Sequence, residues 1–299
     1  MTLQDSRAHR RALLLMLVAP LMWSIAGVVT RNLSPEIQAQ GRFEITFWRS
    51  LFAALCVGLY LVFVQRDFVG AVRRAGRAGM LSGLMWCAMF CCFMLALTLT
   101  TVANTLVVMS VAPLVTAILA RFVLRTPIAP RTWTAICAAS AGMLWMFADS
   151  FAVTDARHVL GMLIAFGVPL ASAINIVNMK RQRLAVDLVP AVFIGGVLSA
   201  ALMLPLALPF IADGRDVLLL AVLGFFQLGI PCAMMVVAAR HLSATELALL
   251  ALLEVLFGTL WAWLGAGETP TSATLVGGAV VLAALVFNEL AGRRATALA

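Results

Sequence analysis

The sequence of 299 residues is 63% hydrophobic and only 11% charged, and its mean hydropathy is +1.04. Soluble domains contain about 25% charged residues, so these figures exclude an ordinary soluble protein and indicate an all-α polytopic membrane protein. The formal net charge of +8 is no evidence of a nucleic-acid partner until the basic residues are located.

The chain begins with a basic segment followed by an apolar run. Arg7, Arg10 and Arg11 precede an apolar segment at 12–30. A cleaved signal peptide would have a short apolar core and a small-residue cleavage site. The long run therefore predicts an uncleaved first membrane span.

Further apolar runs follow, each near the ~20 residues that a helix needs to cross a bilayer. The segments between them are short and leave no space for a soluble domain. In chain order, the ten predicted spans are 12–30, 44–64, 79–98, 102–120, 132–148, 159–179, 188–208, 217–239, 245–265 and 273–290.

The basic residues are distributed unevenly between the two sets of connecting segments. With the N-terminus placed in the cytoplasm, the cytoplasmic segments hold 16 Lys and Arg residues and the opposite segments hold 4, while Arg49 lies within the second span. Cytoplasmic loops carry the Lys/Arg excess in membrane proteins. The pattern predicts that both termini are cytoplasmic, and it explains the net charge with no nucleic-acid partner.

Short segments of the first half recur, in the same order, in the second half. This predicts an internal duplication with two five-helix repeats, at 1–150 and 151–299. Because five is odd, the second repeat must be inverted relative to the first, an arrangement that secondary transporters use. The recurring segments are Leu17–Leu21 with Phe166–Leu170, Gly83 and Cys91 with Gly224 and Cys232, and Arg125–Pro127 with Glu268–Pro270.

The two halves end in comparable segments, Val111–Leu114 with Arg125–Pro127, and Leu253–Val255 with Gly267–Thr269. These ends resemble those of the drug/metabolite transporter superfamily, in its ten-span EamA-type exporter branch. Val255 replaces the proline that is usual in the second motif, and Arg125 stands where the first half often has glutamate. Within this branch, the chain is similar to bacterial exporters of aromatic amino acids and methyl viologen.

The resemblance implies ten helices around a central cavity that opens alternately to each side of a bacterial inner membrane. It implies a transporter of small metabolites. The sequence has no ATPase phosphate loop and its spans hold no catalytic constellation, so neither an enzyme nor a cofactor or metal is expected. One polypeptide already holds both halves, so a monomer is expected to be complete. Alternatives are an exporter of cationic compounds with the same fold and, more distantly, a membrane-embedded enzyme. In small multidrug members a glutamate in the first helix binds protons and drugs, and the first span here has no carboxylate.

The main candidate for the substrate site is Glu254, near the middle of the apolar stretch 247–267. An ionised carboxylate at this depth is unfavourable by roughly 2.5–3.5 kcal/mol on insertion scales, so it normally faces the protein interior or a wet cavity. Glu254 could bind a substrate ammonium, relay protons, or pair structurally with a neighbour.

Other candidates are aromatic, sulfur-containing or polar residues inside the spans. Each has an ordinary alternative, which is core packing for the first group and helix–helix hydrogen bonding for the second. Pro20 and Pro169, at matching positions of the repeats, are candidate hinges. The candidate substrate-binding residues besides Glu254 are Trp23, Trp86, Met89 and Trp261 as cavity walls, and Ser24, Asn175, Asn178 and Gln227 as hydrogen-bonding groups.

These residues favour a neutral, amphipathic substrate such as an aromatic or other hydrophobic amino acid. No span carries Arg or Lys at its centre, so phosphorylated substrates are disfavoured.

Overall fold

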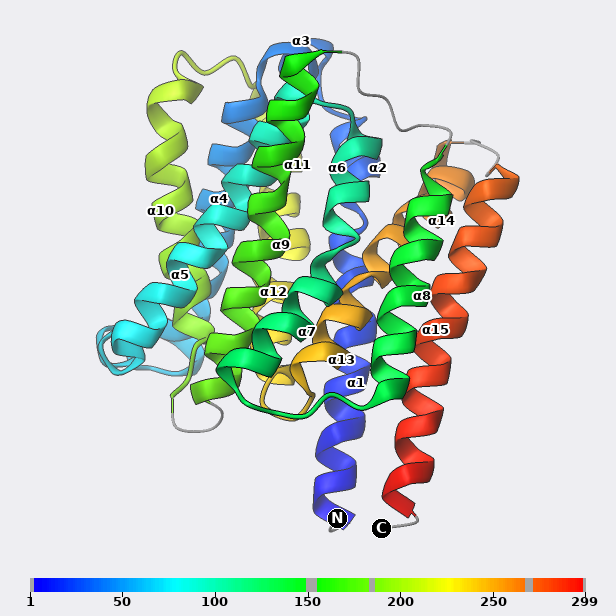
Figure 1. The fold of residues 1–299 in the computed structure, drawn as a ribbon. Helices are drawn as coiled ribbons and strands as arrows, with labels where there is room; N and C mark the ends of the chain where they lie inside the picture. Colours follow the sequence, from blue (N-terminus) through cyan, green and yellow to red (C-terminus); the bar gives the residue numbers. More distant parts are fainter. Residues whose placement is uncertain (1–2, 149–154, 183–185, 267–270, 298–299) are drawn as a thin grey trace.

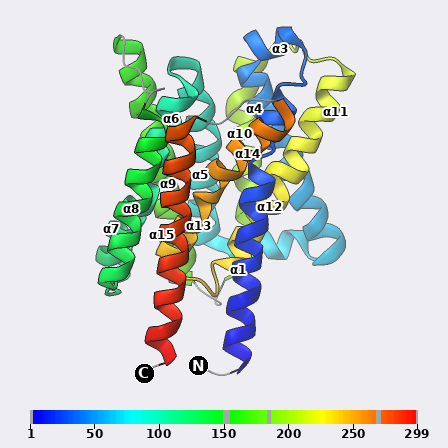
Figure 2. The same cartoon turned by 90° about the vertical axis from the view of Figure 1, so that its right-hand side faces the viewer.

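The computed structural model describes residues 3–148, 155–182, 186–266 and 271–297, and within these residues all regular structure is helical (Figure 1). This confirms the predicted all-α membrane fold. The first helix begins and the last helix ends on the same side of the bundle (Figures 1 and 2). We call this side the terminal end, and the side that carries α3 (Pro35–Gln40) the α3 end.

Several spans consist of two or three consecutive helices. The helices of the first half are α1 (Leu3–Trp23), α2 (Ala26–Thr30), α3, α4 (Arg42–Leu59), the π-helix η1 (Tyr60–Val64), α5 (Phe68–Leu99), α6 (Val102–Met109), α7 (Ala112–Val123) and α8 (Pro130–Met146). Those of the second half are α9 (Ala156–Gln182), α10 (Val189–Ala207), α11 (Gly214–Val222), the π-helix η3 (Leu223–Gly229), α12 (Ile230–Ala238), α13 (Ala244–Ala251), α14 (Leu253–Ala266) and α15 (Ser272–Ala297).

Nine segments of the described chain are long and apolar enough to cross a membrane. The predicted fifth span, 132–148, is not among them; it coincides with α8, which has 17 residues. Nevertheless, α8 runs beside α15 within the bundle (Figures 1 and 2). The count of ten crossings therefore stays a prediction.

Helices from different halves of the chain pack against one another throughout the bundle. The second predicted span (α4) packs on the seventh (α10), and the fifth (α8) packs on the tenth (α15). The third (α5) packs on the sixth (α9), and the first (α1) packs on the eighth (α12). When each span is exchanged with its counterpart in the other half, the first two pairs map onto themselves and the last two map onto each other. Two repeats related by a twofold axis would give this pattern.

The fourth and ninth predicted spans are both broken. The first break separates α6 from α7 at Ser110–Val111, just before Pro113. The second separates α13 from α14 at Leu252. No proline follows this second break, but the Val255 amide bonds to the Leu252 carbonyl at 3.1 Å, a tighter i→i+3 turn. The break therefore does not need the family proline that Val255 replaces.

The third span begins earlier than predicted, with a separate helical turn at the terminal end. The Asp67 side chain accepts a hydrogen bond from the Gly70 amide and so caps α5. At Gly76 φ is 52°, a conformation that glycine adopts without strain. The segment 68–75 therefore turns away from the rest of α5, at the lower left of Figure 1.

Candidate functional site

A cavity lies at the centre of the bundle, between helices of both halves. It has a deeper compartment of about 170 Å³ and a wider one of about 630 Å³. Residues that line both compartments join them into one site. These shared residues are Trp23, Arg49, Phe93, Met109, Glu254 and Val255.

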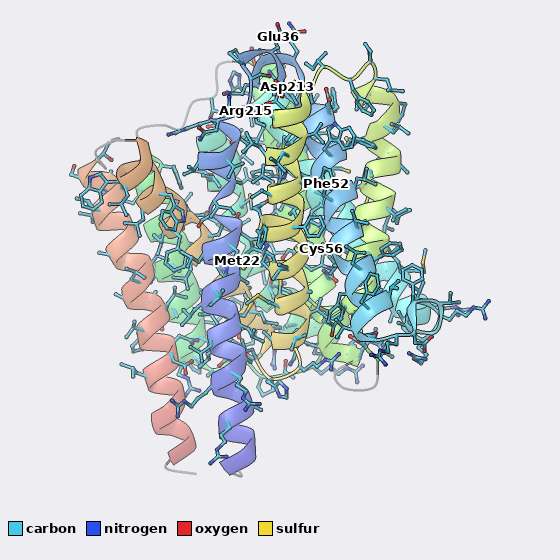
Figure 3. All side chains as sticks on the ribbon, turned by 180° about the vertical axis from the view of Figure 1, so that it is seen from behind. Met22, Glu36, Phe52, Cys56, Asp213 and Arg215 are labelled. Atoms are coloured by element: carbon cyan, nitrogen blue, oxygen red, sulfur yellow. The ribbon has the colours of Figure 1, made fainter. Side chains whose placement is uncertain are left out.

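The wider compartment leads toward the α3 end of the bundle. Its lining includes Arg31 and Gln38, which are both exposed. Figure 3 labels Glu36, Asp213 and Arg215 at this end of the bundle. The cavity is therefore accessible from the α3 end.

Toward the terminal end, the two halves are closed by a packed apolar core. Met16, Leu61, Leu242 and Leu247 are among its fully buried members. In a bilayer, the close van der Waals packing of such side chains holds the helices together.

Polar contacts reinforce this closure. Lys180 Nζ donates hydrogen bonds to the carbonyls of Ala239 and Leu242, at 2.8 and 2.6 Å. Asp187 accepts from Arg240 Nη2 at 2.8 Å and from Gln65 Nε2 at 2.9 Å. The Gln65–Asp187 contact joins the first half to the second.

The walls of the deeper compartment are aromatic and sulfur-rich. The candidates Trp23, Trp86 and Met89 line it, together with Phe90 and Phe93, which the sequence analysis did not single out. The ring centroids of Trp86 and Phe90 are 5.9 Å apart. Such surfaces suit flat or flexible apolar groups.

Arg49 is the main residue of the site that the sequence analysis missed. It lies two turns into α4, and its side chain is only 8% exposed. Nη2 donates to Gln227 Oε1 at 2.7 Å, Nη1 contacts Met94 Sδ at 3.6 Å, and Nε is buried with no partner. The expectation of a site without a buried cation is therefore corrected: a guanidinium borders both compartments.

Gln227 holds Arg49 in place from the second half. It lies in the π-helix η3, and its Nε2 also donates to the Trp23 carbonyl at 3.3 Å. A π-helical turn inserts an extra residue into a helix and is often found at functional sites. Gln227 lines the deeper compartment, so this candidate is part of the cavity.

Glu254 lies at the start of α14, directly after the break at Leu252. It is half-buried and lines both compartments. In the part of the chain that the structure describes, its carboxylate makes no hydrogen bond and no direct ion pair. Arg49 lines the same two compartments. Arg49 and Glu254, the charged residues shared by the two compartments, are therefore not paired directly.

Ser24 and Trp261 contact each other at the side of the cavity. Ser24 lines the wider compartment, and its Oγ accepts a hydrogen bond from Trp261 Nε1 at 3.0 Å. Trp261 itself is not among the residues that line either compartment.

Asn175 and Asn178 lie outside the cavity and join α9 to α5. Asn175 Oδ1 accepts from Ser82 Oγ at 2.5 Å, and Asn178 Nδ2 donates to the Ala78 carbonyl at 2.9 Å. These contacts are the helix–helix bonds that formed the alternative reading of both residues. Ser172, one turn earlier on α9, does line the deeper compartment.

The two candidate hinge prolines occupy different surroundings. Pro20 is buried within the last turn of α1, shortly before this helix gives way to α2. Pro169 lines the deeper compartment, and α9 continues past it to Gln182. Their role as hinges stays a prediction.

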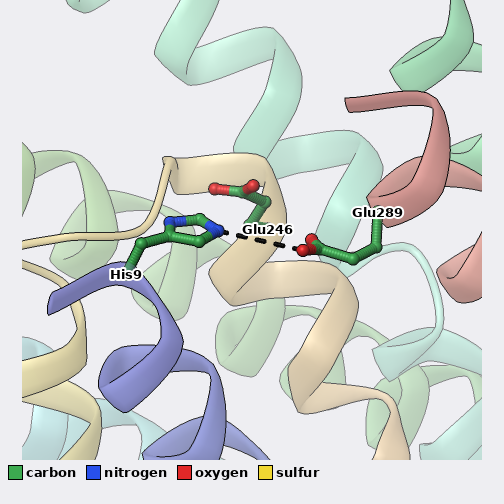
Figure 4. A group of neighbouring side chains, drawn as sticks. All are labelled: His9, Glu246 and Glu289. Carbon is green, nitrogen blue, oxygen red and sulfur yellow. Dashed lines mark ion pairs between the residues drawn. The ribbon is translucent and has the colours of Figure 1, made fainter. Parts of the chain in front are cut away.

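A second polar cluster lies at the terminal end, far from the cavity (Figure 4). His9 of α1 lies 3.9 Å from Glu289 of α15, and Glu246 of α13 lies beside them. Glu246 already accepts from the Ser243 amide at 2.6 Å in a capping box. The cluster therefore joins three helix ends and contributes nothing to the central site.

Comparisons with known proteins agree with this architecture. The family model described as "EamA-like transporter family" matches residues 10–148 and 159–289. A solved structure titled only "Crystal structure of protein" is 19% identical, has a TM-score of 0.78, and covers 95% of this chain and 98% of its own. At this identity, the likeness shows the fold alone. No curated protein matches the chain. Because the family model matches most of its length, the chain belongs to the EamA-like transporter family, and it is a multi-pass membrane transporter.

Proposed function

We propose that this transporter exports aromatic or other hydrophobic amino acids across a bacterial inner membrane by alternating access. The observation that carries the proposal is the composition of the central cavity. Aromatic and methionine walls surround Arg49 and Glu254, the charged residues that border both compartments, while Arg31 and Arg42 line the wider compartment alone. A hydrophobic amino acid has the matching parts, an apolar side chain with one negative and one positive group.

The asymmetry of the cavity supports alternating access. It is accessible at the α3 end and closed at the terminal end by the apolar core and the Lys180 and Asp187 contacts. With cytoplasmic termini, as the distribution of basic residues predicts, this arrangement is the outward-open state. Export requires a second state in which the terminal-end contacts separate and the α3 end closes.

A single chain is proposed to form the complete transporter. The support for this proposal is that residues of both halves of one chain line the cavity. Transport by a chain that is demonstrably monomeric in the bilayer would agree with this proposal. Transport that requires complementation between two inactive chains would contradict it.

The direct test is uptake into inside-out membrane vesicles, with and without a proton gradient. Labelled phenylalanine, tryptophan and leucine form the panel, and glutamate and glucose 6-phosphate are controls. We expect saturable uptake of the hydrophobic amino acids above that of vesicles lacking the protein. Robust uptake of the phosphorylated compound, with none of the amino acids, would overturn the proposal.

An exporter of cationic compounds is the second candidate, because Glu254 has no direct partner in the described chain. A permanent cation such as methyl viologen would be attracted to this carboxylate. Arg49 would repel the same cation from the neighbouring wall, which favours the amino-acid proposal. Methyl viologen belongs in the same vesicle panel, where its uptake in place of the amino acids would favour the second candidate.

A further inference from the structure

We infer that Arg49 is the specificity-determining residue that binds the carboxylate of the substrate, while Glu254 binds its ammonium, so that the cavity selects zwitterions. The inference rests on the proposed function and extends it to the recognition of each charged group. The first observation is that Arg49 borders the cavity with unused binding capacity. A guanidinium has five N–H donors. Arg49 donates to Gln227 through Nη2 and contacts Met94 through Nη1, while Nε is buried with no partner.

An arginine in this position is otherwise poorly compensated. A charged group inside a membrane span normally pairs with another charge or with polar groups. Here the polar contacts of Arg49 are a neutral amide and a thioether, neither of which neutralises the charge. A substrate carboxylate would supply the missing negative charge and could accept two parallel N–H bonds from the guanidinium.

The surrounding residues hold Arg49 for this task. The Gln227 amide, fixed by its second bond to the Trp23 carbonyl, orients the guanidinium from the opposite half of the chain. Thr46 and Ser50, within one turn of Arg49 on α4, also line the deeper compartment. The guanidinium is therefore placed on a polar strip of α4 that faces the cavity.

Glu254 provides the opposite charge without neutralising Arg49 directly. If the two side chains served only as a structural ion pair, they would be expected in direct contact. Instead both line the same two compartments, and no direct ion pair joins them in the described structure. A zwitterion placed between them can engage both groups at once, with its apolar side chain against Trp86 and Phe90.

The test compares ligands that lack one charged group, with the purified full-length transporter. Displacement of labelled L-phenylalanine is measured with phenylalanine, phenylalaninamide and 3-phenylpropionate. The amide lacks the carboxylate, and the propionate lacks the ammonium. Loss of a hydrogen bond to a charged group corresponds to about 10- to 150-fold in affinity. We expect a weakening in this range for each analogue on the unmodified protein.

Two variants then assign the loss to Arg49. In Arg49→Gln, phenylalanine should bind as weakly as phenylalaninamide, and the amide should lose little further affinity. Arg49→Lys keeps the charge but not the planar fork, so its affinity for phenylalanine should lie between those of the unmodified protein and Arg49→Gln. Arg121→Gln, at an exposed arginine of α7 away from the cavity, is the matched control and should behave like the unmodified protein.

The outcomes separate this inference from the proposed function. Equal binding of phenylalanine and phenylalaninamide by the unmodified protein would overturn the carboxylate site and leave amino-acid transport in place. Equal losses for both ligands in Arg49→Gln would show a structural role and also overturn it. Absence of any phenylalanine or tryptophan binding would overturn the proposed function itself. If Arg49→Gln does not fold, the analogue comparison on the unmodified protein decides.

Discussion

Trp261 Nε1 donates a 3.0 Å hydrogen bond to Ser24 Oγ, which joins α14 to the junction between α1 and α2 across 237 positions of sequence. Ser24 in turn donates to the Leu21 carbonyl at 2.7 Å. The contact thus ties the α1–α2 junction of the first half to the body of α14 in the second half. Movement of one is expected to be transmitted to the other.

The first prediction tests this contact. Trp261→Phe and Ser24→Ala should each reduce the free energy of unfolding by roughly 0.5–1.5 kcal/mol, the net value of an intramolecular hydrogen bond. The double variant should lose little more unfolding free energy than either single variant, because each single variant already removes the bond. Reversible unfolding in mixed detergent micelles measures all three.

Trp263→Phe is the control for this cycle, because Trp263 lies two residues further along α14 and is 49% exposed. Its unfolding free energy should stay close to that of the unmodified protein. Additive losses from Trp261→Phe and Ser24→Ala would show that the two residues act independently.

The second prediction concerns the close packing of α8 on α15. A Cβ at Gly142 would lie 2.8 Å from the Gly277 carbonyl oxygen, and one at Gly277 would meet the Gly142 carbonyl oxygen. Backbone atoms cannot give way as a flexible side chain does. Gly142→Ala and Gly277→Ala should therefore each destabilise the protein by about 1–3 kcal/mol, the usual range for overpacking.

Gly258→Ala is the matched control, because a Cβ there meets nothing within 4 Å. In thermal unfolding in detergent, Gly142→Ala and Gly277→Ala should each have a lower midpoint than the unmodified protein. The midpoint of Gly258→Ala should be unchanged or slightly higher. Tolerance of alanine at both Gly142 and Gly277 would show that α8 and α15 can separate at little cost.

The third prediction tests the closure of the terminal end. Removal of the Lys180 hydrogen bonds in Lys180→Met should shift the population toward the state that is open at this end. Arg181→Met, at the exposed neighbouring position, is the control. The measurement is thiol labelling from the terminal side in a variant that keeps Cys232, which lines the deeper compartment, as its single cysteine.

Faster labelling in Lys180→Met than in Arg181→Met is the expected result. Identical labelling rates would mean that the apolar core alone holds this end closed.

The fourth prediction concerns pH and the cap of α5. The hydrogen bond from Arg74, followed by that from the Gly70 amide, holds the pKa of the Asp67 carboxyl below its usual value. Because the folded pKa is lowered, the stabilising contribution is complete above the unfolded value of about 3.9 and is lost as the pH falls through the folded pKa. Amide exchange of 68–75, corrected for intrinsic rates, should therefore show weaker protection at a pH below the folded pKa of Asp67 than at a pH above its unfolded pKa.

Asp67→Asn retains a side chain that caps helices well but cannot be ionised. Its protection in 68–75 should therefore vary less with pH than that of the unmodified protein. Equal pH dependence in the two proteins would assign the effect to another group.

Much of the fold could be predicted because the bilayer imposes a length and a polarity on each helix. The spans around Glu254 and Trp23 followed from apolar runs, and both residues line the cavity. The helical segment 68–75 was not expected, since it is too short and too basic to read as a span. Its turn depends on one backbone conformation at Gly76, which composition does not encode.

The site was harder to predict than the spans, because a polar residue in a span can face either a cavity or another helix. Asn175 and Gln227 were equally good candidates by sequence, yet one bonds to Ser82 and the other lines the cavity. Arg49 was detectable as a charge inside the second span. Its importance depends on the pairing of α4 with η3, which places Gln227 opposite it and which only the folded chain shows.

The last prediction concerns Glu254→Gln, which preserves size and hydrogen bonding but removes the charge. If Glu254 binds the substrate ammonium, binding and transport should both weaken, by the equivalent of roughly 1.5–3 kcal/mol for a lost charge-assisted contact. If it relays protons, gradient-driven accumulation should be abolished while exchange of labelled for unlabelled substrate continues. If it is structural, the unfolding midpoint should fall before transport does. The cavity favours binding, because Glu254 is the only carboxylate among the described residues that line either compartment, which leaves a relay without a second acidic site there. Parallel measurement of accumulation, exchange and thermal stability distinguishes the three roles, and a stable Glu254→Gln protein with unchanged affinity and rate would remove Glu254 from the site.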